Sequence, residues 1–189
     1  MFNQATFSAV APVSLDDIKI HLRLSTTAFD GYVSGLVNAA TNIVERYINC
    51  PLFKTDWTYF PEATFEFPLV IPKGNVTAVS DFSFRSADGV WHSIDPNSTW
   101  DYTIESGRCK IFLRPFVVLA LPVLYSEAPF RVSFTAGFGT TPRAVPSPIQ
   151  HAIKVIVSEM FNQTDGFSAM PLPAQMLLDP FRYWFKEMF

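Results

Sequence analysis

The sequence predicts an α+β fold, in which an N-terminal helical hairpin and C-terminal helices form a small bundle and an antiparallel β-sheet or sandwich is inserted between them. Apolar residues recur at intervals of three and four near both ends of the chain, which is typical of amphipathic helices. Between residues 52 and 139 they recur at intervals of two, as in half-buried strands. With 189 residues, of which 49% are hydrophobic and 16% charged, the chain can bury a real core. This balance excludes disorder as a description of the whole chain.

The first region, residues 1–51, is predicted to contain two helices, over residues 15–24 and 28–48. Ser14 can cap the first helix, because a serine hydroxyl accepts a hydrogen bond from an unpaired amide of the first turn. The polar residues 25–27 (Ser-Thr-Thr) interrupt the apolar pattern and can cap the second helix. A short polar break between two helices predicts an antiparallel αα-hairpin.

The second region, residues 52–139, is predicted to be rich in strands. Its β-branched and aromatic runs are separated by turn sequences such as Ser86-Ala-Asp-Gly89, in which Asp-Gly tolerates the positive φ of a tight hairpin. The apolar, Pro-broken stretch 115–129 is predicted as a long loop or irregular strand. The expected strands span residues 55–60, 64–71, 76–84, 90–94, 100–104, 108–114 and 130–136.

The third region, residues 140–170, contains a helix that is predicted to begin near Pro148 and to run to about Phe161, completing the helical body. The last region, residues 171–189, is called the docking segment here. It has prolines on either side of one helical turn and then an aromatic end. Such side chains either pack on a core or anchor an interface, since Tyr, Trp, Phe, Met and Arg are enriched at interfaces. The candidate docking residues are Phe181, Arg182, Tyr183, Trp184, Phe185, Met188 and Phe189.

No pattern in the sequence indicates catalysis, a cofactor or a metal. The three histidines, His21, His92 and His151, are far apart in the sequence, and no Cys-x-x-Cys or His-x-x-x-His occurs. No Gly-x-Ser-x-Gly nucleophile motif is present either. Cys50 and Cys109 are interpreted as reduced thiols, because no export signal is visible. We therefore expect a protein that is not an enzyme.

The charge and hydropathy patterns argue against a surface that binds nucleic acid tightly and against a membrane-spanning segment. A net charge of −3 gives no global basic footprint. The longest apolar stretch, 112–125, is interrupted by Arg114 and two prolines and is too short to cross a bilayer.

Nineteen Phe with little charge suggest that some apolar surface lies against another chain. The basic residues of the predicted strands form either a local patch for an acidic partner or a solvated sheet face; they are Arg108, Lys110, Arg114 and Arg131.

Four sequence segments, in this order, resemble a known family. Residues 14–24 (Ser-Leu-Asp-Asp-Ile-Lys-Ile-His-Leu-Arg-Leu) and the helix end at 43–48 (Ile-Val-Glu-Arg-Tyr-Ile) are similar to the opening of head–tail connector (adaptor) proteins of long-tailed bacteriophages and gene-transfer-agent particles. Residues 130–139 and 145–153 resemble the strand-to-helix junction of that family, "Val-x-Phe-x-Ala-Gly-Tyr-Gly … Val-Pro-x-x-Ile-x-x-Ala-Ile". The resemblance covers nearly all of residues 13–185.

The resemblance implies a structural virion protein. Such adaptors form a twelve-fold ring of identical subunits beneath the portal at the capsid vertex. The ring extends the DNA channel and joins the capsid to stopper or tail-completion proteins. The implied partners are therefore the portal protein, a stopper or tail-completion protein, further copies of this chain, and genomic double-stranded DNA that passes without sequence-specific binding. The implied location is the virion neck, after synthesis in the host bacterial cytoplasm. C-terminal segments of relatives bind the portal, which implies that the docking segment of this chain binds the portal too.

Two alternatives remain open from the sequence. The chain can be a different neck protein, such as a stopper or tail-completion subunit. It can also be a β-sandwich module that binds carbohydrate through exposed Trp57, Trp91 or Trp100. For the adaptor, we expect deletion of residues 171–189 to abolish portal binding and to leave the fold intact.

Overall fold

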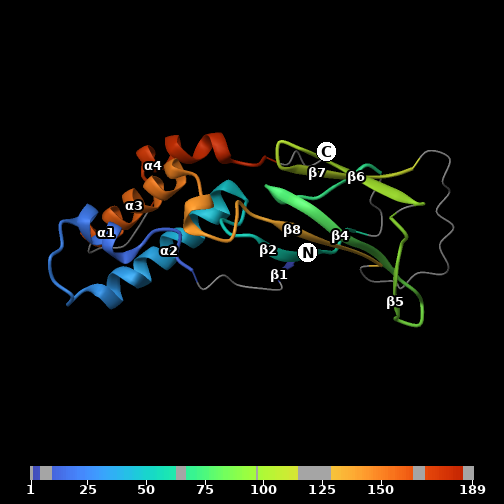
Figure 1. The fold of residues 1–189 in the computed structure, drawn as a ribbon, viewed down its shortest axis with the longest axis horizontal. Coiled ribbons are helices and arrows are strands. Elements are labelled where there is room, and N and C mark those ends of the chain that lie inside the picture. Colours follow the sequence, from blue (N-terminus) through green and yellow to red (C-terminus); the bar gives the residue numbers. More distant parts are fainter. Residues whose placement is uncertain are drawn as a thin grey trace. The chain divides into compact units, whose positions relative to one another are not determined.

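The computed structural model describes residues 2–4, 10–62, 67–96, 98–114, 129–163 and 169–184. The chain divides into two compact units, which we call the β unit (residues 1–7 and 54–137) and the helical unit (residues 8–53 and 138–189). Four α-helices and two antiparallel sheets are present in the described part (Figure 1). The predicted α+β fold is confirmed, with the helices drawn from both ends of the chain.

The helical unit contains α1 (Leu15–Leu22), α2 (Asp30–Ile48), α3 (Ser147–Asn162) and α4 (Leu172–Leu178). Two short 3₁₀ turns, η1 (Pro142–Ala144) and η2 (Asp179–Phe181), precede α3 and follow α4. The first three helices agree with the predicted ranges to within two residues at each end. Helix α3 packs against α1, α2 and α4, so it is the central element of this unit.

Of the four described α-helices, α1 alone has a side-chain cap at its N-terminus. The Ser14 hydroxyl accepts a hydrogen bond from the amide of Asp17 at 3.1 Å, as predicted. Helix α2 has no side-chain cap, and its N-cap residue is Phe29, so the predicted capping by residues 25–27 is wrong. Within that stretch, Thr26 accepts instead from the amide of Ala28 at 3.2 Å, which closes a turn ahead of the helix.

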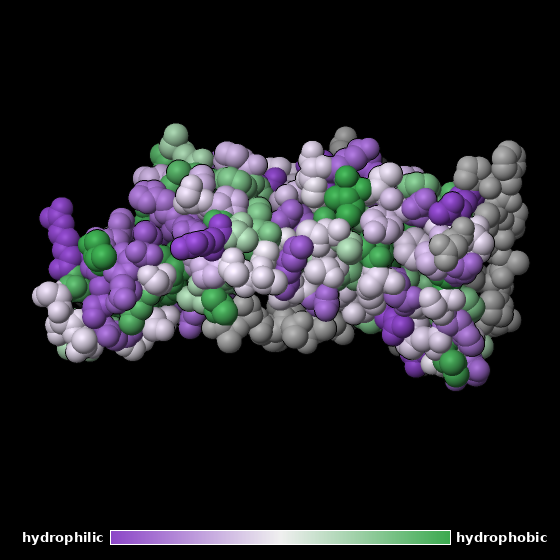
Figure 2. Space-filling model, in the orientation of Figure 1, coloured by the Kyte–Doolittle hydropathy of each residue, from purple (hydrophilic) through white to green (hydrophobic). Residues whose placement is uncertain are grey.

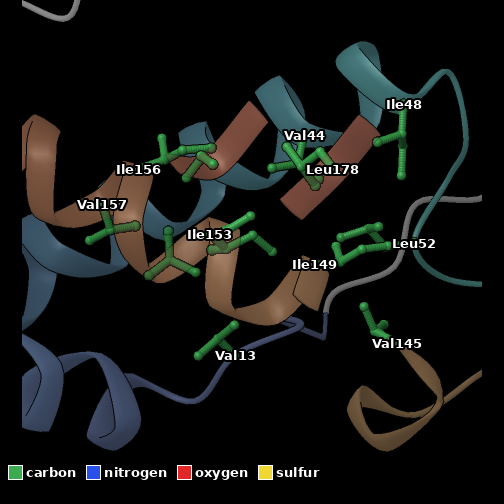
Figure 3. Close-up of a cluster of buried hydrophobic side chains, with 14 of the residues drawn as sticks. Val13, Val44, Ile48, Leu52, Val145, Ile149, Ile153, Ile156, Val157 and Leu178 are labelled. Carbon is green, nitrogen blue, oxygen red and sulfur yellow. The ribbon is translucent and has the colours of Figure 1, made fainter. Parts of the chain in front are cut away.

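The core of the helical unit is formed by the apolar faces of α2, α3 and α4 (Figure 3). Leu178 of α4 points toward the same cluster as Val44 of α2 and Ile153 of α3. Burial of such aliphatic side chains contributes about 1.5–3 kcal/mol each. The fully buried residues of these three helices include Val33, Ala40, Val44, Ile48, Ile149, Ala152, Ile153, Ile156, Val157, Ala174 and Leu178.

The β unit contains a five-stranded sheet in the order β1-β2-β8-β4-β5 and a three-stranded sheet in the order β3-β7-β6. All pairs are antiparallel. The strands of the larger sheet are β1 (Phe2–Gln4), β2 (Thr55–Tyr59), β8 (Phe130–Ala136), β4 (Val76–Arg85) and β5 (Trp91–Ser93). Those of the smaller sheet are β3 (Leu69–Val70), β7 (Arg108–Leu113) and β6 (Trp100–Glu105).

Each of the seven predicted strand ranges contains a strand, and one strand was not predicted. The strand expected over 64–71 is short, with only Leu69–Val70 in strand conformation among its described residues. The unpredicted strand is β1, which pairs Phe2 with Tyr59 at the sheet edge. Nearly all of the predicted loop at 115–129 lies outside the described residues.

The two sheets share one hydrophobic core. Alternate residues of β8 are buried, and the buried set packs with Phe82 of β4 and with residues of the smaller sheet. The ring of Phe82 lies 5.9 Å from that of Trp100 in an edge-on arrangement and 6.0 Å from that of Phe130 in a stacked one. Cys109 is also buried here, and burial raises the pKa of its thiol to about 12, so the thiol is protonated at neutral pH. Cys50 and Cys109 are free thiols, as predicted.

A tight turn returns the chain from the β unit to the helical unit. Gly137 has a φ of 128°, a conformation that residues with a side chain rarely adopt. Within the helical unit, Gly139 forms a bridge with Phe53, and the amide of Phe138 donates to the Leu52 carbonyl at 3.3 Å. A Cβ added to Gly139 would lie 2.4 Å from the Cβ of Ala144. The backbone therefore approaches itself closely at this turn.

The substitution Gly139→Ala should lower the free energy of unfolding by about 1–3 kcal/mol, because the new methyl group overlaps that of Ala144. The double variant Gly139→Ala/Ala144→Gly should recover most of this loss. As a control, Gly35→Ala adds a methyl group on α2 where no atom lies within 4 Å, so it should stabilise by about 0.5–1 kcal/mol. Urea denaturation measures all three. Equal stability of Gly139→Ala and the wild type would contradict the close approach.

Candidate functional site

The structure describes four of the seven candidate docking residues. Phe181, Arg182 and Tyr183 are half-buried, whereas Trp184 has 61% of its surface exposed. Phe185, Met188 and Phe189 lie outside the described residues. Within the described part, the first three of these residues are thus packed on the helical unit and the fourth is mostly exposed.

Helix α4 anchors the first part of the docking segment in the helical core. Ala174 and Leu178 are fully buried in the helical core, and η2 follows α4 directly. Phe181 at the end of η2 packs edge-on against Phe138, with ring centroids 6.4 Å apart. Removing residues 171–189 would delete two buried core residues, so the expectation that this deletion leaves the fold intact conflicts with the packing. A clean test must remove less of the chain.

Tyr47, in the last turn of α2, contacts the docking segment directly after α4. Its hydroxyl donates a hydrogen bond to a carboxylate oxygen of Asp179 at 2.6 Å. The guanidinium carbon of Arg182 lies 4.5 Å from the centroid of the same tyrosine ring. We call Tyr47, Asp179 and Arg182 the Tyr47 clasp. Its members come from α2, η2 and the residue after η2, so the clasp joins segments 132 residues apart in the sequence.

Two further contacts extend the clasp along the chain. The guanidinium carbon of Arg182 lies 3.6 Å from the ring centroid of Trp184, which is close enough for a cation–π interaction. Arg182 therefore contacts both the Tyr47 ring and the Trp184 ring. The amide of Tyr183 donates to the carbonyl of Ile48 at 3.0 Å, and this bond supplies a partner for a carbonyl at the end of α2.

The pKa of Tyr47 is raised above the ordinary tyrosine value of 10.0. The largest cause is the hydrogen bond to Asp179, followed by desolvation and by the negative charge of Asp179, with Arg182 acting in the opposite direction. Because the folded-state pKa is the higher one, the stabilising contact is fully present below about pH 10. It is lost as the pH rises through the raised pKa.

Other apolar side chains of the helical unit are exposed. Phe29 and Tyr32 at the start of α2 have 46% and 55% of their surfaces exposed, and their rings lie 6.1 and 6.0 Å from that of Phe161. On α4, Leu172 and Met176 lie one turn apart and are about two-thirds exposed. On the face drawn in Figure 2, hydrophobic residues reach the surface at several separate places. Phe29 and Tyr32 lie outside the docking segment, whereas Leu172 and Met176 lie within it.

The sequence did not reveal that two histidines meet on the helical unit. His21 of α1 and His151 of α3 are exposed, with ring centroids 6.1 Å apart in an edge-on arrangement. The pKa of His21 is lowered, first by desolvation and then by the nearby charges of His151 and Lys154. Among the residues that the structure describes, no group of three or more His, Cys, Asp or Glu is placed to hold a metal ion. None of the described helices is both long enough and apolar enough to cross a bilayer.

The basic residues of the β unit do not form one patch. Arg108 and Lys110 lie on β7 and Arg114 directly follows it, whereas Arg131 lies on β8 in the other sheet. Arg114 and Arg131 each form an ion pair with an aspartate, at 3.2 and 3.5 Å. Their charges are thus partly compensated within the unit.

The three tryptophans considered for carbohydrate binding are engaged within the β unit. Trp100 is 2% exposed and its indole N–H donates to a backbone carbonyl at 2.7 Å, so it is unavailable to a sugar. Trp57 and Trp91 are half-buried. The ammonium of Lys73 lies 4.3 Å from a Trp57 ring centroid, and the guanidinium carbon of Arg131 lies 4.7 Å from that of Trp91. These contacts do not favour an open sugar-stacking platform.

Residues 12–81 match the family described as "Phage gp6-like head-tail connector protein". The predicted resemblance to head–tail connector proteins is confirmed. The matched segment includes α1, α2, β2, β3 and the first part of β4. The docking segment lies outside it. No curated protein matches the chain by sequence similarity.

Three solved structures contain chains with a similar fold. The first is described as "Neck of empty GTA particle computed with C6 symmetry", with a TM-score of 0.80 and 20% identity over 99% of this chain and 97% of that chain. A chain of "Virion of native gene transfer agent (GTA) particle" gives 0.78 and 22% with the same coverage. A chain of "Neck of native GTA particle computed with C12 symmetry" gives 0.75 and 20%, again with this coverage. At this identity the likeness shows a shared fold over the full length of both chains.

Tyr47 should titrate above pH 10.0, and the variant Asp179→Ala should lower its pKa toward that value, because the main cause of the shift is removed. Subtracting the ultraviolet phenolate titration of Tyr47→Phe from that of the wild type isolates this one tyrosine. The same subtraction in the Asp179→Ala background gives the second value. A wild-type difference curve with its midpoint at or below 10.0 would rule out the hydrogen bond in solution.

Proposed function

We propose that this chain is a structural subunit of a virion neck and acts as a head-to-tail adaptor. The observation that carries the proposal is the full-length likeness, with a TM-score of 0.80, to a chain from the neck of a GTA particle. The match of residues 12–81 to head–tail connector proteins supports the same role from sequence. The protein would be located in the neck at the portal vertex and would have no catalytic activity.

The proposed assembly is a closed ring of twelve copies beneath the portal. Similar chains belong to necks computed with C6 and C12 symmetry, which supports a cyclic arrangement. A cyclic ring uses a heterologous contact, so each subunit needs two different complementary patches. The helical unit has two groups of exposed apolar residues on different elements, the Phe29–Tyr32–Phe161 group and the Leu172–Met176 pair. Large permanent interfaces are hydrophobic, which is consistent with this exposure.

The proposed ring extends the DNA channel and connects the portal to a stopper or tail-completion protein. A net charge of −3 suits a channel through which DNA must slide, because dense Lys and Arg would bind phosphates tightly. The ion pairs of Arg114 and Arg131 further reduce the free positive charge of the β unit. The docking segment is proposed to contact the portal.

The test is size-exclusion chromatography with light scattering, on the chain alone and mixed with the portal protein of the same particle. We expect co-elution at about one adaptor per portal subunit. Truncation after Trp184, which removes only residues 185–189, should weaken this complex and leave the thermal midpoint unchanged. The matched control is Val90→Ser, which replaces a 51% exposed apolar residue of the β unit and should bind as the wild type does.

A chain that stays monomeric and does not bind the portal would contradict the adaptor role. Electron microscopy of particles made without the chain then separates the other neck proteins from the adaptor. Loss of an adaptor should leave heads that end in a bare portal.

A further inference from the structure

The contacts around Tyr47 divide the docking segment into two parts. Phe181, Arg182 and Tyr183 each make a contact inside the helical unit. Phe181 packs against the Phe138 ring, Arg182 lies over the rings of Tyr47 and Trp184, and the Tyr183 amide donates to the Ile48 carbonyl. All three are half-buried. Trp184 is the first described residue after these three, and 61% of its surface is exposed.

We infer that Tyr47 is a positioning residue for the docking segment. The Tyr47 clasp fixes the point at which the chain leaves the helical unit, and the contacts with the portal are made by Trp184 and the residues that follow it. Phe181, Arg182 and Tyr183 are anchors rather than contact residues. This inference rests on the proposed function and refines its site.

The geometry assigns this role to Tyr47 because two independent contacts converge on one side chain. The hydroxyl donates a hydrogen bond to a carboxylate oxygen of Asp179 at 2.6 Å, at the beginning of η2. The ring face stacks with Arg182, three residues later, at 4.5 Å. A single hydrogen bond would leave the segment free to rotate about it. The hydrogen bond to Asp179, the stacked Arg182 and, directly after it, the Tyr183 amide bound to Ile48 together fix both position and direction.

Such a clasp would act through preorganisation. A segment that is held at its base loses less conformational freedom when its remaining residues bind, so its apparent affinity is higher. In population terms, the apparent dissociation constant equals the intrinsic one divided by the fraction of molecules with the clasp closed. Opening the clasp therefore lowers the association rate constant. Removing a contact residue raises the dissociation rate constant instead.

Four variants separate the clasp from the fold. Tyr47→Phe keeps the ring and removes only the hydroxyl that binds Asp179. Asp179→Ala removes the acceptor, whereas Asp179→Asn retains a carbonyl oxygen that can accept the same bond and is the matched conservative control. Trp184→Ala removes the proposed contact residue and leaves the hydrogen bond to Asp179 in place.

Each variant is measured in the full-length chain by hydrogen exchange of the Tyr183 amide, by thermal unfolding, and by the rate constants for binding the isolated portal protein. In Tyr47→Phe and Asp179→Ala, we expect the Tyr183 amide to exchange about fivefold faster, the equivalent of one net hydrogen bond. Portal association should slow by less than about fivefold, in proportion to the closed fraction that is lost. Asp179→Asn should resemble the wild type in both. Trp184→Ala should leave Tyr183 exchange near the wild-type rate and should speed portal dissociation at least tenfold. The thermal midpoint should fall by only about 2–4 °C in Tyr47→Phe and Asp179→Ala, as the loss of one hydrogen bond requires. It should stay unchanged in Asp179→Asn and Trp184→Ala.

The outcomes distinguish the inference from the function beneath it. If the wild-type chain does not bind the portal, the proposed function fails, and the exchange data still decide whether the clasp exists. If the wild type binds and Tyr47→Phe exchanges faster but associates equally fast, the positioning role is overturned and the adaptor role stands. If Tyr47→Phe leaves Tyr183 exchange unchanged, the clasp itself is overturned.

Discussion

The antiparallel pairing of β2 with β8 is the constraint on which the rest of the chain depends. The helical unit is assembled from the two ends of the sequence, with α2 ending at Ile48 and α3 beginning at Ser147. Between them lies the whole β unit. The register that pairs Thr55 with Ala136 brings the two ends of this insertion together. Residues directly outside the ladder are then close enough for Phe53 to bridge Gly139 and for α2 and α3 to share a core.

This arrangement explains why the glycines of the strand-to-helix junction matter. The chain must leave β8 and enter the helical unit within a few residues so that α3 meets α2. Gly137 supplies a positive φ, and Gly139 allows the backbone to approach Ala144. Immediately after this turn, Val145 and Ile149 enter the helical core. The sequence motif that resembles the connector family at this place is thus a device for closing a long insertion.

The sequence predicted the elements whose signal is local, and it failed where the signal is not. Helices α2 and α3 have long apolar stripes, and their extents were predicted to within two residues. Strand β1 has only three residues and pairs with a strand more than fifty residues away, so neither length nor periodicity marks it. The predicted cap of α2 failed because Ser and Thr signals do not specify which of several adjacent residues turns the chain. The contact of His21 with His151 required knowing that α1 packs on α3.

In the candidate site too, composition alone did not show which residues pack on the helical unit and which are exposed. An aromatic, Met- and Arg-rich end is suited equally to packing and to docking, since both use large side chains with low rotamer entropy. In the sequence, Tyr47 stood out only as part of the segment 43–48 that resembles the connector family. Its contact with Asp179, 132 residues later, separates the anchored residues from the exposed one. The family match covers residues 12–81 and thus the helical hairpin that carries Tyr47, but not the segment that Tyr47 holds. Tyr47 therefore links the part of the chain that the family match covers to a C-terminal segment that it does not cover.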